Sequence, residues 1–366
     1  MKITFILPRA DTSGGVRVAS IYAKRLHDRG HQVVVVSRPH RKATVRERVR
    51  AFVGRQPLPY AARQATSLLD GLGLDHRSIE SHRPITAADV PDADVVVATW
   101  WETAEWMADY PESKGSKAYF IQHYEVHEGL PVDRVEATWR LPMHKIVIAN
   151  WLADLAKNRF GDSDYSLVPN SVDQTQFFAP PRDKQQTPTI GLMYSHVPFK
   201  GCDISLKAFE LARQNIPGLK MVAFGARQPT PDLPLPTETV FAQHPAQHTI
   251  RDIYAQADAW LVASRSEGFG LPILEAMACR TPVIATPTGA APELLAAGGG
   301  ILVPPEDPPA MAAAIEQICR LDNAAWRALS DKAYDTATRY TWDDATTLFE
   351  SALRRAREKS HQVAAL

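Results

Sequence analysis

The stretch SEGFGLPILEAMACRTPVIA, from Ser266 to Ala285, contains two glutamates, Glu267 and Glu275, with seven residues between them. The apolar run that ends at Ser264 predicts a buried strand before it, and TPVIAT predicts another strand after it. Between them, a Gly-Phe-Gly loop leads to Pro272, a residue favoured in the first turn of a helix. The stretch therefore predicts a strand, a glycine loop, a helix and a second strand, which is the repeating unit of a parallel α/β sheet.

The same unit recurs along the chain. Apolar runs predict further strands at KITFILP, HQVVVVS, DVVVATW, KAYFIQ and HKIVIAN in the first half, and at PTIGLMY, LKMVAFG, AWLVAS and GILVPP in the second. Runs that are apolar throughout are typical of parallel strands covered by helices on both faces. The segment SLVPNSVDQTQFFAPPRDKQQTP separates the halves and is typical of a linker. We expect an α/β fold with two doubly wound domains, 1–169 and 170–340, facing across a cleft, and a C-terminal helix, 341–366, that crosses back to the first domain.

Composition excludes several classes of protein. A chain of 366 residues is too long for one ordinary core, which supports two domains. The net charge is zero, so no global field favours a nucleic-acid partner. Three widely spaced cysteines fit a reducing compartment, and the apolar N-terminal run breaks at Pro8, as in a strand rather than a signal peptide. No apolar stretch is long enough to span a membrane. We expect a cytoplasmic protein that binds no nucleic acid.

The glycine loop predicts a phosphate site. Ligands of doubly wound sheets bind beyond the carboxyl ends of the strands, where the N–H groups of Phe269, Gly270 and Leu271 would face an anion. Glu275, one turn inside the helix, could accept hydrogen bonds from two ribose hydroxyls, and Glu267 could accept them from sugar hydroxyls. The alternative is that Glu267 caps the helix and Glu275 is a solvated helix residue. The whole string favours a nucleoside diphosphate sugar as the ligand, with no metal and no cofactor.

Five motifs, in order, resemble those of a known family. EGFGLPILE resembles the E-x7-E motif of the retaining glycosyltransferases of family 4, which have the GT-B fold of two Rossmann-like domains. SGGVRV, VPNSVD, PFKGCDISLKAF and TPTGAAPELL resemble other motifs of that family, and the resemblance covers nearly the whole chain. The segments TWWETAEW, YFIQHYEVHE and TWRLPMHKIVIANWLAD also resemble a branch that includes bacterial rhamnosyltransferases of surface polysaccharides.

The resemblance implies roles in the second domain for three charged residues. Lys200 would neutralise the donor diphosphate, Glu275 would bind the ribose, and Glu267 would bind the donor sugar. In the first domain, Gly14 and Gly15 would line the cleft.

His123 would lie at the reacting centre. One departure from the family pattern concerns a second positive charge. The family has an arginine five or six residues before the lysine, where this chain has Ser195 and Tyr194. Arg17 and His196 are the candidate substitutes for that charge.

The activity that the resemblance implies is a metal-independent hexosyltransferase of polysaccharide biosynthesis. A hexose or deoxyhexose would move from a nucleoside diphosphate sugar to a glycan, lipid-linked or small-molecule acceptor with retained configuration. Two alternatives remain open: another enzyme of the same fold, such as a nucleotide-sugar epimerase or a phosphorylase with pyridoxal phosphate, and a non-catalytic nucleotide-sugar-binding protein.

Two other patterns suggest a metal site. HYEVHE contains His123 and His127 four residues apart, but it lacks the H-E-x-x-H order and follows the end of a strand. Asp92–Asp94 and Asp162–Asp164 resemble an Asp-x-Asp metal motif, but each precedes a strand and so lies at the wrong end of the sheet. We expect turn residues at both places and no metal site.

Three tryptophans follow the DVVVATW strand. They could stack on an acceptor sugar or simply pack against neighbouring elements. They are Trp100, Trp101 and Trp106.

The segment RPHRKATVRERVRAFVGR is locally basic in a neutral chain. Its apolar residues recur at helical spacing, which predicts an amphipathic helix. The helix is either a solvated surface element or a peripheral contact with an anionic membrane. The apolar residues are Val45, Val49, Phe52 and Val53, and the arginines that would contact lipid are Arg46, Arg48, Arg50 and Arg55.

Overall fold

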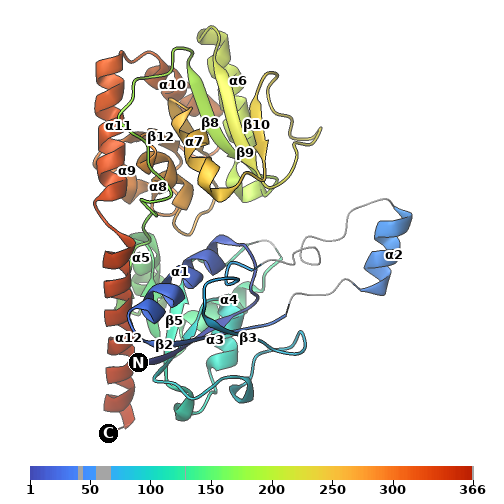
Figure 1. The fold of residues 1–366 in the computed structure, drawn as a ribbon, viewed down its shortest axis with the longest axis vertical. Helices are drawn as coiled ribbons and strands as arrows, with labels where there is room; N and C mark the ends of the chain where they lie inside the picture. The colour runs from blue at the N-terminus through green and yellow to red at the C-terminus, as the bar shows by residue number, and fades with distance from the viewer. Residues whose placement is uncertain (40–43, 55–66, 128, 365–366) are drawn as a thin grey trace. The chain divides into compact units, whose positions relative to one another are not determined.

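The computed structural model describes residues 1–39, 44–54, 67–127 and 129–364 (Figure 1). The chain divides into two compact units. Unit 1 comprises Met1–Ile148, Leu152–Val168 and Thr346–Leu366, and unit 2 comprises Ala149–Trp151 and Pro169–Ala345. Within these described ranges, no helix combines the length and the apolar character needed to cross a membrane.

Unit 1 is built on a seven-stranded parallel sheet with the order β3-β2-β1-β4-β5-β6-β7. Strands β1 and β4 lie at its centre, and every residue of β4 is buried because helices cover both faces. The strands are β1 (Lys2–Leu7), β2 (Gln32–Ser37), β3 (Asp75–Ser78), β4 (Val95–Ala98), β5 (Ser116–Ile121), β6 (His144–Val147) and β7 (Tyr165–Leu167).

The described helices of unit 1 connect these strands. They are α1 (Gly14–Asp28), α2 (Val45–Val53), η2 (Ala87–Asp89), α3 (Trp101–Met107), η3 (Glu112–Lys114), α4 (Val132–Trp139) and α5 (Asn150–Phe160). Helix α1 begins at Gly14, so Gly14 and Gly15 form its first turn.

The C-terminal helix α12 (Trp342–Ala364) completes the core of unit 1. The ring of Phe349 stacks on that of Tyr22 with 4.2 Å between centroids, and it meets the edge of Phe120 at 5.0 Å. Burying such an aromatic side chain contributes about 1.5–3 kcal/mol to the stability of the fold. Helix α12 therefore belongs to the core of unit 1, although it lies at the other end of the sequence.

Unit 2 has a six-stranded parallel sheet with the order β10-β9-β8-β11-β12-β13. Its strands are β8 (Thr189–Tyr194), β9 (Lys220–Gly225), β10 (Val240–Gln243), β11 (Ala259–Val262), β12 (Val283–Ala285) and β13 (Gly300–Leu302). Its helices are η4 (Pro198–Lys200), α6 (Cys202–Asn215), η5 (Gln247–Thr249), α7 (Ile250–Ala255), α8 (Leu271–Ala278), α9 (Ala291–Leu295), α10 (Pro308–Cys319) and α11 (Asn323–Thr338).

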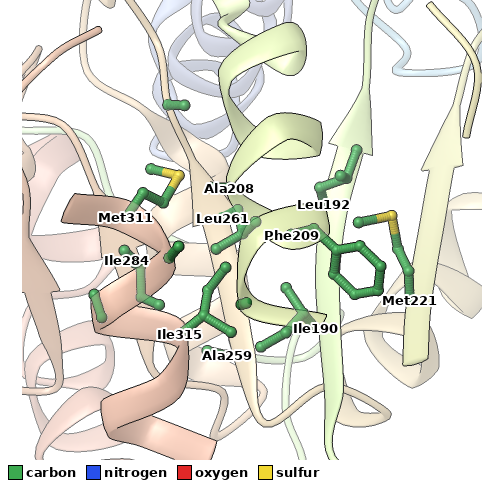
Figure 2. Packing of buried hydrophobic residues seen from close by; sticks show 14 of the residues in the cluster. Ile190, Leu192, Ala208, Phe209, Met221, Ala259, Leu261, Ile284, Met311 and Ile315 are labelled. Carbon is green, nitrogen blue, oxygen red and sulfur yellow. The ribbon is translucent and has the colours of Figure 1, made fainter. Parts of the chain in front are cut away.

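The main apolar cluster of unit 2 lies where α6 and α10 cover the sheet. Figure 2 shows Phe209 of α6 beside Met221 of β9, and Ile315 of α10 over the strand residue Ala259. All four side chains are buried. This packing gives a rigid base for the loops at the carboxyl edge of the sheet, where the predicted donor residues lie.

The predicted α/β class with two doubly wound parallel sheets is confirmed. The sequence analysis missed three edge strands, β3, β7 and β10, because DHRS is polar, YSL has only three residues and VFAQ only four. Polar or short strands are common at sheet edges. The segment predicted as a linker packs on unit 2: Arg182 donates a 2.6 Å hydrogen bond to the carbonyl of Ala257, and its guanidinium lies over the Trp326 ring.

Candidate active site

The glycine loop of unit 2 runs from the end of β11 to the start of α8. Gly270 is the N-cap of α8 with a φ of +94°, a conformation that side chains other than glycine rarely adopt. Leu271 begins the helix, Pro272 has no N–H, and the amide of Ile273 donates a 2.9 Å hydrogen bond to the Gly270 carbonyl, so of the first-turn amides it is that of Leu271 that has no intrahelical acceptor. Gly289, on the loop after β12, packs so closely that an added Cβ would lie 2.8 Å from the carbonyl oxygen of Phe269. The loop is therefore held in a single path with its amides at the helix start.

Glu267 is the first carboxylate of the loop and is only 9% exposed. The Lys200 amine lies 2.8 and 2.9 Å from its two oxygens, and the Ser264 hydroxyl donates a 2.7 Å hydrogen bond to Oε1. The helix cap is Gly270, so the alternative in which Glu267 caps α8 is wrong. Lys200 and Glu267 form an ion pair at the carboxyl edge of the sheet.

Glu275 lies on the first turns of α8 and is 7% exposed. The hydroxyl of Tyr254, a side chain fully buried on α7, donates a 2.9 Å hydrogen bond to its Oε2. The alternative in which Glu275 is a solvated helix residue is therefore wrong. A hydrogen bond from a buried phenol fixes the rotamer of this carboxylate.

Lys200 is the last residue of the η4 turn, directly before Gly201. Gly201 has a φ of +62°, and an added Cβ there would lie 1.8 Å from the carbonyl oxygen of Ala263 at the end of β11. Only glycine fits so close an approach. The turn therefore holds Lys200 next to the loop that carries Glu267.

The positions without the family's arginine are occupied by groups with other partners. Tyr194 is buried, and its hydroxyl donates to the carbonyl of Leu233 at 2.6 Å. The Ser195 hydroxyl accepts a hydrogen bond from the amide of Val197, and His196 donates from Nε2 to the carbonyl of Gln228 at 3.0 Å. The structure places His196 on the loop after β8, two residues before the turn that bears Lys200.

In unit 1, the first turn of α1 lies beside the end of β5. The side-chain amide of Gln122 donates a 3.0 Å hydrogen bond to the carbonyl of Gly15, and an added Cβ on Gly15 would lie 3.6 Å from the same amide nitrogen. Gly14 begins the helix, and Arg17 follows with its amide bonded to the Ser13 carbonyl. The sequence analysis did not single out Gln122. The sequence feature that could have pointed to it is its position directly before His123.

His123 follows Gln122 at the carboxyl edge of the sheet. Its Nδ1 lies 2.8 Å from the carbonyl of Tyr124, and because a carbonyl only accepts, Nδ1 carries the proton. The His123 and His127 rings lie 4.7 Å apart, and burial lowers the pKa of His127. Burial also raises the pKa of the neighbouring Glu125 well above its usual value. Within the described residues, no three His, Cys, Asp or Glu side chains form a group that could hold a metal ion.

Two of the three tryptophans after β4 have an arginine over the ring. Trp101 is buried, and the guanidinium of Arg134 lies 4.8 Å from its ring centroid. The guanidinium of Arg38 covers the ring of Trp106 at 4.5 Å. Trp100 is half-buried. Packing therefore accounts for Trp101 and Trp106.

The predicted site residues thus fall into two groups, one in each unit. The group in unit 2 is Lys200, Glu267, Phe269, Gly270, Leu271 and Glu275, with His196 near by, and the group in unit 1 is Gly14, Gly15, Arg17 and His123.

Residues 187–320 match the family described as Glycosyl transferases group 1. Among curated proteins, a D-inositol 3-phosphate glycosyltransferase of Mycobacterium leprae is 30% identical over 173 residues, which are 43% of this chain and 40% of that protein. The corresponding enzyme of Segniliparus rotundus is 35% identical over 112 residues, which are 27% and 24% of the two chains. The chain thus spans about two fifths or less of the length of these curated relatives.

Solved structures match over the whole chain. Sucrose-phosphate synthase from Thermosynechococcus elongatus has a TM-score of 0.69 at 18% identity, with 100% of both chains covered. HepE from Anabaena, solved in complex with UDP-glucose, has a TM-score of 0.70 at 18% identity and the same coverage. The chain has the GT-B fold, and the match to the group 1 glycosyl transferases lies within unit 2.

Proposed function

We propose that this protein is a retaining glycosyltransferase that moves a hexose or deoxyhexose from a nucleoside diphosphate sugar to a glycan, lipid-linked or small-molecule acceptor. One observation carries the proposal: two buried carboxylates, Glu267 and Glu275, lie at either end of a glycine loop whose amides begin a helix, with the Lys200 amine on Glu267. A helix start that can bind an anion, a cation beside it and two fixed acceptors for hydroxyl groups together suit a sugar nucleotide.

Departure of the diphosphate is the step that this arrangement would assist. Lys200 and the amides of Gly270 and Leu271 would stabilise the charge that develops on the leaving phosphate, and one preorganised donor of this kind contributes about 3 kcal/mol. Glu275 would hold the ribose and Glu267 the donor sugar. No residue is assigned as a nucleophile, so the acceptor would attack from the face that the diphosphate leaves, and the leaving phosphate would take the acceptor proton.

The unit 1 group would serve the acceptor side. His123, whose Nδ1 proton points to the Tyr124 carbonyl, would lie at the reacting centre on this side. Gly14 and Gly15 form the first turn of α1 and allow close approach of a ligand to the backbone. We infer that the enzyme is cytoplasmic and needs no metal or cofactor.

Binding of a nucleoside diphosphate is the first test. HepE was solved with UDP and with UDP-glucose, which makes UDP the first nucleotide to examine here, beside GDP and dTDP. At about 100 times its dissociation constant, a ligand of the folded state adds about 2.7 kcal/mol of stability, which a thermal-shift assay detects. Transfer from the matching sugar nucleotide, with the anomeric configuration of the product read by NMR, tests the reaction. A chain that none of the three nucleotides stabilises would contradict the proposal.

One observation favours a second candidate. Ser195 stands where the family has an arginine, so a positive charge expected at the leaving group is missing from its usual place. A protein that binds a sugar nucleotide without transferring the sugar would fit that loss. Nucleotide binding with neither transfer nor donor hydrolysis would favour this candidate over the enzyme, and interconversion of the donor sugar would indicate an epimerase.

A further inference from the structure

The turn that carries Lys200 is held by an arginine from another strand end. Arg265 lies on the loop after β11, two residues before Glu267. Its main-chain amide donates a 2.7 Å hydrogen bond to the carbonyl of Phe199, and its guanidinium donates one of 2.6 Å to the carbonyl of Pro198. These two bonds engage two of the three residues of the η4 turn, and Lys200 is the third.

Two carboxylates hold the same guanidinium in place. Asp203, in the first turn of α6, accepts a pair of 2.9 Å hydrogen bonds from the two terminal nitrogens of Arg265. Glu306, on the loop after β13, accepts a 3.0 Å bond from one of them. Bidentate pairing of this kind fixes a guanidinium in orientation as well as in distance. Both carboxylates raise the pKa of Arg265, so it stays charged.

Two carboxylates neutralise the charge of Arg265, so this residue does not replace the arginine that the family has before the lysine. With Asp203 and Glu306 on its nitrogens, the guanidinium has little net charge to offer a diphosphate. Its contacts instead tie the loop before Glu267, the start of α6 and the loop after β13 to the turn that bears Lys200.

We propose that Arg265 is a positioning residue that sets the place of the Lys200 amine, and with it the affinity of the site for a diphosphate. The role in diphosphate binding rests on the proposed function, whereas the effect on Lys200 is open to test without any nucleotide. Without Arg265 the η4 turn loses its bond at Pro198, and the Lys200–Glu267 ion pair loosens.

The nucleotide-free test measures the reactivity of the Lys200 amine. Wild type and Arg265→Met are labelled briefly with an amine-acylating reagent, and labelling of each lysine is followed by mass spectrometry. We expect Lys200 to react several-fold faster in Arg265→Met, while the exposed Lys207 of α6 keeps its rate. Arg213→Met, which removes a surface arginine of the same unit paired with Glu210, is the matched control. An unchanged labelling rate at Lys200 would overturn the proposal.

The second test separates phosphate recognition from folding. Dissociation constants for UDP and UMP are measured by calorimetry for wild type, Arg265→Met, Lys200→Met and the double variant. We expect each single variant to reduce the preference for UDP over UMP by about ten-fold, the effect of losing one charge-assisted hydrogen bond, and the double variant to lose no more than Lys200→Met. Additive losses would show that Arg265 acts on the diphosphate independently of Lys200, and a lowered melting temperature with an unchanged preference would show that it is merely structural; either result would overturn the proposal. A wild type that binds no nucleotide would contradict the proposed function, and the labelling result would still decide the role of Arg265.

Discussion

Each glutamate of the E-x7-E segment is buried and bonded to a hydroxyl group. Ser264 donates to Glu267 from three residues away, and Tyr254 donates to Glu275 from a different helix. A buried carboxylate with a fixed donor keeps one rotamer, which is the preorganisation that a binding site needs. The two hydroxyls therefore belong to the site as much as the glutamates do.

Substitution of Glu275 is expected to weaken nucleotide binding. In Glu275→Ala two ribose hydroxyls lose a charged acceptor, and each such hydrogen bond is worth about 1.5–3 kcal/mol. Titration calorimetry with the nucleoside diphosphate that stabilises wild type measures the loss. Tyr254→Phe, which removes only the hydroxyl that orients the carboxylate, should weaken binding in the same direction but less. Unchanged affinity in Glu275→Ala would exclude Glu275 from the site.

Substitution of Glu267 is expected to have opposite effects on binding and on transfer. Its carboxylate is paired with the Lys200 amine and would repel a diphosphate. The Glu267→Gln variant should therefore bind UDP more tightly than wild type. Transfer should fall, because the donor sugar loses its charged acceptor. Calorimetry with UDP and a transfer assay on the same preparation give both values, with Lys200→Met as the comparison that weakens binding. Weaker UDP binding in Glu267→Gln would show that Glu267 does not compete for Lys200.

At the scale of elements, helix α2 stands out because its apolar side chains are exposed. Phe52 is 88% exposed, Val45 77%, Val53 76% and Val49 56%. These side chains therefore do not face the core of unit 1. Arg46, Arg48 and Arg50 accompany them on the helix, whereas Arg55 lies outside the described residues.

We predict that α2 binds anionic membranes. An exposed apolar face inserts at the headgroup boundary, and each arginine near an anionic surface adds about 1 kcal/mol, which salt screens. Co-sedimentation should show wild type on anionic liposomes at low salt, less at high salt, and little on neutral vesicles. Replacing Arg46, Arg48, Arg50 and Arg55 by glutamine should release it, whereas the same change at four surface arginines of unit 2 should not. Wild type that stays in the supernatant with anionic vesicles would identify α2 as a solvated helix.

The first residue of β6 gives a prediction on pH. His144 is buried, its Nε2 lies 2.9 Å from the Ser166 hydroxyl, and Lys359 of α12 lies 3.4 Å from Nδ1. Burial, with the nearby charges of Lys359, Arg355 and Lys145, lowers the pKa of His144 from 6.5 to about 4 despite the opposing charge of Asp162.

A histidine held neutral destabilises the fold in acid. Between pH 6.5 and pH 4 the unfolded chain binds a proton at His144 that the folded chain does not, so stability falls as the pH falls through that window. The contribution is at most about 3.5 kcal/mol, from about 1.4 kcal/mol per pKa unit. Urea denaturation at several pH values should show a shallower pH dependence in His144→Gln than in wild type. An equal slope in the two proteins would mean that the imidazole titrates in the fold as it does in the unfolded chain.

For the whole molecule, we predict that turnover survives EDTA. Lys200 and the start of α8 would neutralise the leaving charge, and the two Asp-x-Asp segments precede β4 and β7, at the amino edge of the unit 1 sheet rather than at its carboxyl edge, where ligands of such sheets bind. Asp94 accepts a hydrogen bond from the amide of Lys2, and Asp92 pairs with Lys114. Transfer should therefore proceed at an unchanged rate after dialysis against EDTA. Loss of turnover that magnesium or manganese restores would contradict this account of the leaving group.

The sequence by itself determined the α/β class, the central strands and the glycine loop. These features are local: continuous apolar runs such as VVVA of β4 can only be buried strands or helices, and Gly-Phe-Gly before Pro272 sets a loop and a helix start within five residues. The edge strands β3, β7 and β10 were not predicted, because an edge strand needs no continuous apolar run.

Only the tertiary structure decided which side chains hold the site residues. Tyr254 is 21 residues from Glu275, Glu267 is 67 from Lys200, and Arg265 is 67 from Pro198. No pattern along the chain marks these pairs, since parallel strands bring their carboxyl ends together whatever their separation in sequence. In the same way Phe349 joins Tyr22 only because α12 packs into the core of unit 1. Local composition determines each element, and burial of the elements against one another determines its partners.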